Sequence, residues 1–118
     1  MMPDAQLYNL DQLKEIDDNE DFILQVITIF LETVPCNTEA MVKACTEKEW
    51  EQVYFFAHKI KSNINLLNIG SIVDEIKFVE QSAKNSVNIE MIPEKINFID
   101  GVIRSAAERM KIDFALNK

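Results

Sequence analysis

Apolar residues recur every three or four positions along most of the chain, which is the spacing of one buried stripe on an α-helix. The most regular example runs from Trp50 to Leu67. The apolar positions within it are Trp50, Val53, Ala57, Ile60, Ile64 and Leu67. We therefore expect a helix there that buries this stripe and leaves its opposite side in solvent.

Three further segments carry the same pattern and predict three more long helices. The first begins in the acidic run 17–21, the second follows Gly70, and the third begins near Pro93. Acidic residues favour the first turn of a helix, and proline costs little there because the amide that it lacks would have no helical partner. The expected core positions in the four segments are Ile27, Phe30, Val53, Ala57, Ile60, Ile64, Ile76, Val79, Ile99 and Ile103.

Two local signals on the N-terminal side predict a short helix and a bend. Asn9 offers an N-cap, with Gln12 three residues later, for a short helix that ends near Ile16. Pro35 falls inside the first long apolar stripe, where its ring crowds the preceding turn and one amide donor is lost. We expect Pro35 to kink that helix or to restart it.

Two capping boxes predict where the following helices begin. In this motif a hydroxyl side chain accepts a bond from the amide three residues later, and the acidic side chain there reaches back. Thr46 with Glu49 predicts the start of the central helix, and Ser71 with Asp74 predicts the start of the next. Gly70, between them, can adopt the left-handed conformation that ends a helix.

Four long amphipathic helices with short connections predict an all-α fold, because no stripe can be buried alone. We expect an antiparallel up-and-down four-helix bundle with a short extra N-terminal helix. The 118 residues, of which 47% are hydrophobic and only two are glycine, favour one helical domain spanning residues 1–118. Because the pattern fills the chain from Met1 onwards, we expect a free-standing monomer.

Charge and hydropathy limit the classes of function. The net charge of −8 argues against nucleic acid, whose phosphates require a concentrated basic face. No run of about 18 apolar residues and no signal peptide is present, so we expect no membrane span and a cytoplasmic protein. Cys36 and Cys45 have no ligand-like spacing with each other or with His58, so we expect neither a disulfide nor a metal site.

The single histidine of the chain, His58, lies in the middle of the most regular predicted helix. At roughly 100° per residue it points about 130° away from the centre of the apolar stripe, so it should lie in solvent. Lys61 stands one turn after it, and Phe55, Ser62 and Asn65 share its side. A rigid helix therefore presents an imidazole beside an ammonium, a hydroxyl and an aromatic ring.

The pattern Ala-His-x-x-Lys-Ser, residues 57–62, resembles the histidine-containing phosphotransfer (HPt) domain family. In this chain the pattern lies inside a helix that begins with a tryptophan and is followed by Gly70. The resemblance covers most of the chain and weakens after about Asn85. The stretches that carry it are Tyr8-Asn9-Leu10, Asp21-Phe22, Phe30-Leu31-Glu32-Thr33-Val34-Pro35 and Trp50 to Gly70.

This resemblance implies a function and a partner. In the family, the histidine at the position of His58 is the phosphoacceptor and the lysine at Lys61 steadies the phosphoryl group. The partner is a receiver domain of a response regulator or hybrid histidine kinase, whose aspartate exchanges the phosphoryl group while holding Mg²⁺. The family's usual glycine is replaced here by Ser62, and its usual serine or alanine by the larger Asn63.

The residues themselves agree with a relay rather than a kinase. Imidazole is a nucleophile that is free to attack near neutral pH, so an exposed histidine can carry a phosphoryl group without a separate base. The chain has no Gly-rich phosphate loop and no clustered metal carboxylates. We therefore expect a phosphoryl carrier that does not use ATP and needs no cofactor of its own.

An aromatic ring on the outer side of the helix suggests where a partner docks. Phe55 is not explained by this domain's core, and an apolar spot beside a reactive group often marks a docking surface. A contact with the N-terminal segment would be another way to cover it. The residues expected to contact the partner are Tyr54, Phe55, Lys59, Ser62, Asn65 and Ile69.

Two other interpretations stay open. A helical adaptor would bind a signalling partner without chemistry, and His58 would then be incidental. A bundle that binds a small ligand would need a polar group in a buried stripe, and we identify none in the sequence. Phosphorylation of His58 separates the relay from the adaptor.

Overall fold

The computed structural model describes residues 7–115, and every regular element within them is a helix. The expectation of an all-α fold is thus confirmed for this part of the chain, whereas residues 1–6 and 116–118 of the expected domain lie outside it. The elements are α1 (Asp11–Ile16), α2 (Glu20–Thr46), α3 (Trp50–Leu66), η1 (Gly70–Ile72), α4 (Val73–Asn85), η2 (Ile89–Met91) and α5 (Ile92–Asp113), where η marks a single 3₁₀ turn.

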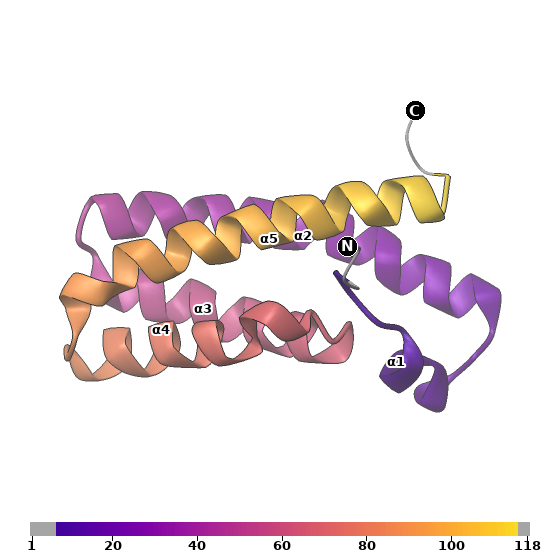
Figure 1. Cartoon of the computed structure of the whole chain (residues 1–118), viewed down its shortest axis with the longest axis horizontal. Coiled ribbons are helices and arrows are strands. Elements are labelled where there is room, and N and C mark those ends of the chain that lie inside the picture. The colour runs from indigo at the N-terminus through magenta and orange to yellow at the C-terminus, as the bar shows by residue number, and fades with distance from the viewer. Residues whose placement is uncertain (1–6, 116–118) are drawn as a thin grey trace.

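The four longer helices lie side by side, as Figure 1 shows. Helix α3 packs against α2 and α4, and α5 packs against the same two helices from the other side. Their buried side chains join in one hydrophobic core, to which α1 adds Leu13. No helix in the described part of the chain is long and apolar enough to cross a membrane.

The ten core positions expected from the sequence are all buried, and none of them is more than 1% exposed. They come from α2, α3, α4 and α5. The spacing of three and four residues therefore identified the buried face of each longer helix, because residues at this spacing form one continuous apolar face that can be removed from water.

Helix α2 continues without interruption through Pro35, so the expected restart at this residue is wrong. Proline in a helix interior removes one backbone hydrogen bond and favours a bend. Figure 1 shows the first turns of α2 inclined to the rest of the helix. The helix begins where the acidic run predicts it, with the Asn19 side chain accepting from the amides of Asp21 and Phe22 at 2.8 and 3.3 Å.

The capping box expected at Thr46 and Glu49 does not form. Thr46 is the last residue of α2, and its hydroxyl donates back to the carbonyl of Val42 at 3.1 Å. A hydroxyl in a helical turn competes for the carbonyl four residues earlier, which removes it from a capping role. The connection to α3 is instead closed by the backbone, through the amide of Glu49 and the carbonyl of Ala44 at 2.9 Å.

Gly70 does not adopt the left-handed conformation that we expected at the end of α3. Asn68 has the positive φ of 47° after α3, and no glycine in the described residues has a positive φ. Asparagine tolerates this conformation because its short side chain can bond locally. Ser71 lies inside η1, and no side chain caps η1 or α4, so the second capping box is absent as well.

The N-terminal segment ties the short first helix to the bundle. Helix α1 ends at Ile16 as expected, but its N-cap is Leu10 and not Asn9, whose side chain accepts from the amide of Asp11 at 2.7 Å. The backbone amide of Asn9 donates to the carbonyl of Leu67 at 2.8 Å. The hydroxyl of Tyr8 donates to Asp113 at 2.6 Å, and burial together with this bond raises the pKa of the phenol.

Candidate functional site

His58 lies near the middle of α3, on the side of the helix that borders α4. Its side chain is 62% exposed. Ala57 and Ile60, next to it along the helix, are fully buried and belong to the core. The packing of α3 thus fixes the backbone that carries the imidazole while the ring itself lies in solvent, as the apolar stripe predicts.

A buried carboxylate that the sequence interpretation missed contacts this imidazole. The Glu80 side chain reaches from α4, is only 4% exposed, and places Oε2 at 2.5 Å from Nδ1 of His58. Its other oxygen, Oε1, accepts a hydrogen bond from Nζ of Lys61 at 2.7 Å. Glu80 therefore links His58 to Lys61, the two residues to which the family resemblance gives a chemical role, and we call these three residues the His58 cluster.

The carboxyl group of Glu80 is ionised in this arrangement. Burial alone raises its pKa, but the hydrogen bonds from Lys61 and His58 outweigh burial and hold the pKa below the ordinary value. A buried charge is tolerated only when it is paired and hydrogen-bonded. Both oxygens of Glu80 meet that condition.

The ionised carboxylate determines which nitrogen of His58 can react. A carboxylate only accepts hydrogen bonds, so Nδ1 must carry the proton that it shares with Glu80. In the neutral imidazole Nε2 then has a free lone pair. Since Nδ1 is covered by Glu80 and most of the ring is exposed, Nε2 is the nucleophilic nitrogen that an incoming group can reach.

Aromatic rings border the imidazole along α3. The Tyr54 ring lies 5.9 Å from the His58 ring, measured between centroids. Phe55 is 51% exposed and places its ring 5.1 Å from that of Phe56 in an edge-to-face contact. Nζ of Lys59 lies 5.4 Å from the centroid of Phe55, within cation–π range. Half of an aromatic side chain thus remains in water one turn before His58.

The other residues expected at the docking surface divide into two groups. Ser62 is exposed and Asn65 is partly exposed. Ile69 is fully buried, so the expectation that it contacts a partner is wrong. It follows the end of α3, and its amide donates to the carbonyl of Ile64 at 3.0 Å, in a turn that directs the chain back to the core.

Glu80 had a signal in the sequence that we did not use. It lies four residues after Ile76 and three before Ala83, so it belongs to the apolar stripe of α4. Our expectation that no polar group falls in a buried stripe is therefore wrong. The pairing of Glu80 with His58 and Lys61, 22 and 19 residues away, depends on how α3 and α4 pack and is not visible in local spacing.

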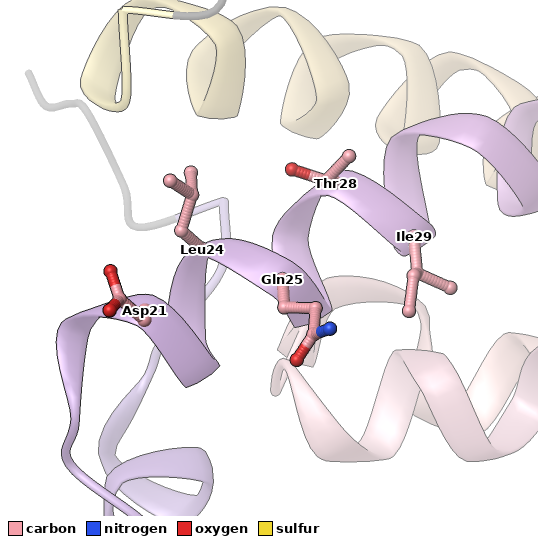
Figure 2. A pocket seen from close by; sticks show the side chains of 5 residues that line it. All are labelled: Asp21, Leu24, Gln25, Thr28 and Ile29. Atoms are coloured by element: carbon pink, nitrogen blue, oxygen red, sulfur yellow. The ribbon is translucent and has the colours of Figure 1, made fainter.

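A shallow pocket lies elsewhere, on the first turns of α2, and Figure 2 shows the side chains around it. They are Asp21, Leu24, Gln25, Thr28 and Ile29. None of them belongs to the His58 cluster, and only Asp21 is ionisable. Within residues 7–115 no three histidine, cysteine, aspartate or glutamate side chains converge in a way that could hold a metal ion.

No protein-family model, curated protein or solved structure matches this chain. The candidate site is therefore interpreted from its own geometry. That geometry offers one exposed nucleophilic nitrogen, one buried carboxylate behind it and one ammonium on the same carboxylate.

We predict that Glu80 makes stability depend on acid pH. The pKa of Glu80 in the folded protein lies below the ordinary 4.5. The carboxylate therefore contributes fully to the free energy of unfolding above about pH 4.5, and this contribution is lost as the pH falls through the lower folded pKa. Glu80→Gln removes this titration. Urea unfolding at neutral pH and at about pH 3 gives the free energy of unfolding of both proteins. Between these two pH values the wild type should lose more of this free energy than Glu80→Gln does. A constant difference would contradict an ionised Glu80.

Proposed function

We propose that this protein is a histidine phosphotransfer protein, in which His58 relays a phosphoryl group between aspartates of receiver domains. The observation that carries the proposal is the contact between Nδ1 of His58 and the buried carboxylate of Glu80, which leaves Nε2 exposed as the nucleophile. The resemblance of residues 57–62 to the HPt family supports it. The partners would be the receiver domains of response regulators or hybrid histidine kinases.

The proposal includes the helix arrangement that the four amphipathic segments predict, an antiparallel up-and-down four-helix bundle preceded by a short helix. The closed set of neighbours, in which α3 and α5 each pack against both α2 and α4, supports this arrangement. Short connections between consecutive helices also favour it.

The transfer step requires no proton to move on this chain. The lone pair of Nε2 attacks the phosphorus of an aspartyl phosphate, so an N–P bond forms. The P–O bond to the aspartate breaks, and its electron pair stays on the leaving carboxylate. The phosphorylated ring keeps its proton on Nδ1 and becomes positively charged, and Glu80 at 2.5 Å stabilises that charge. Transfer to a second receiver domain is the reverse step.

Lys61 supports this chemistry in two ways. Its ammonium, bonded to Oε1 of Glu80, keeps the carboxylate ionised and in place. Its charge also lies one helical turn from His58, so it would help to neutralise the phosphoryl group bound there. Phosphoryl transfer depends mainly on positioning and on neutralising charge, and the remaining positive charge would come from Mg²⁺ in the receiver domain.

His58→Gln is the variant that tests the function. The wild type, incubated with a purified receiver domain that carries labelled phosphate on its aspartate, should acquire phosphate that is labile in acid and stable in base. The His58→Gln protein should acquire none, because glutamine has no nucleophilic nitrogen. Its helical circular dichroism should match the wild type, with only a modest fall in melting temperature, because Glu80 keeps its hydrogen bond from Lys61. Failure of the wild type to accept phosphate from a panel of receiver domains or from phosphoramidate would favour the adaptor instead.

Lys61→Ala should slow the transfer step while the helices remain intact. The loss of a charge-assisted hydrogen bond costs about 1–3 kcal/mol, which corresponds to a rate roughly five- to 150-fold lower. Quench-flow measurement of transfer from a phosphorylated receiver domain gives this rate. Lys43→Ala, on the exposed side of α2, is the matched control. Equal rates for the two variants would exclude Lys61 from the transfer step.

Phe55→Ala should weaken receiver binding by about 1–3 kcal/mol, the range for burying such a side chain. Melting should change little, because the ring is half exposed in the free protein. Phe98→Ala on α5 is the matched control, since Phe98 is 49% exposed and lies on a different helix. A sharp fall in melting temperature with normal binding would instead make Phe55 a packing residue.

A further inference from the structure

Two lysines of α4, Lys77 and Lys84, lie on either side of Glu80 along the helix. They stand three residues before it and four residues after it, so the three residues share one flank of α4. That flank faces α3, because Glu80 contacts His58 and Lys61 across the helix pair. Both lysines are exposed. The α4 side of the reactive histidine is thus bordered by two ammonium groups.

These two lysines differ from several other lysines of the chain in having no close carboxylate partner among the described residues. Within residues 7–115 neither Lys77 nor Lys84 takes part in an ion pair. Lys95 and Lys111, in contrast, lie 2.9 and 3.5 Å from a glutamate. An exposed and uncompensated cation contributes fully to the potential that an approaching molecule meets.

The surface around His58 therefore differs in sign from the molecule as a whole. The chain carries a net charge of −8. Lys59 and Lys61 nevertheless lie within one turn of His58 on α3, and Lys77 and Lys84 lie about one turn from Glu80 on α4. Glu80 itself is buried and already bonded to His58 and Lys61. Exposed carboxylates near this surface are Glu51 on α3, about two turns from His58, and Asp74 on α4, about one turn from Lys77.

We infer that Lys77 and Lys84 form an electrostatic docking site for the acidic face of a phosphorylated receiver domain. This inference rests on the proposed function and extends it to residues outside the His58 cluster. A receiver domain presents a phosphorylated aspartate and metal-binding carboxylates, and a chain of −8 repels such a partner at long range. Within a Debye length, about 8 Å at physiological salt, the local cations reverse the sign of the interaction. The two lysines of α4 thus raise the rate of productive encounter and orient the partner over Nε2.

Charge reversal tests this docking site. The variants are Lys77→Glu, Lys84→Glu and the double variant that combines them. The control for each single variant is Lys43→Glu, and the control for the double variant is Lys43→Glu combined with Lys14→Glu. Lys43 and Lys14 are exposed, lie on α2 and α1, and have no ion pair among the described residues, so the controls change the net charge equally. All variants should melt near the wild type, because no buried contact is altered.

Transfer from a receiver domain phosphorylated with labelled acetyl phosphate is measured over a range of salt concentrations. At low salt the double α4 variant should accept phosphate roughly tenfold more slowly than its control, within the range of electrostatic steering. The gap should close at about 1 M salt, where the Debye length falls to about 3 Å. Labelling by phosphoramidate, a small donor that needs no protein docking, should be the same in all variants.

The outcomes separate the docking site from the proposed function. Equal salt-dependent rates for the α4 variants and their controls would overturn the docking site and leave the relay in place. A slowdown that persists at high salt would also overturn it, because the lysines would then act through packing or in the chemical step. A wild type that accepts phosphate from neither receiver domains nor phosphoramidate would overturn the relay, and the docking site with it.

Discussion

The shared carboxylate of Glu80 is the interaction on which the candidate site depends. A charge that is only 4% exposed is tolerated because His58 and Lys61 each donate to one of its oxygens. The donors belong to α3 and the carboxylate to α4, so the arrangement exists only when these two helices pack in one register. The register of α3 against α4 and the orientation of the His58 ring therefore depend on the same contact.

The apolar stripes determine how far each helix is rotated and hence where these side chains point. Ala57 and Ile60 are fully buried on α3, which places His58 at the edge of the helix pair rather than beneath it. On α4, Ile76 and Val79 are fully buried and turn Glu80 towards α3. A rotation of either helix would break both bonds to the carboxylate and expose core residues, so the site is as rigid as the core that supports it.

Much of this arrangement could be predicted from the sequence, because a stripe of apolar residues defines the buried and exposed sides of a helix. The prediction failed where the helix ended or where two helices met. The expected docking surface includes Ile69, but α3 ends at Leu66 and the chain turns at Asn68, whose φ is positive. Glu80 was missed because its significance comes from a partner on α3, and α4 alone shows only an acidic residue in an apolar stripe.

The lysines of α3 near His58 differ from those of α4 in whether they already contact a neighbouring side chain. Lys61 is bonded to Glu80, and Lys59 lies over the ring of Phe55, so the two lysines of α3 are each shared with a neighbour. In the proposed relay, the half-exposed Phe55 ring would supply apolar contact area, which governs how long a complex lasts. Uncompensated charge on α4 would govern how often the partners meet. Because Phe55 lies on α3 and the two lysines lie on α4, substitutions in the proposed relay would change complex lifetime and encounter rate separately, without altering His58.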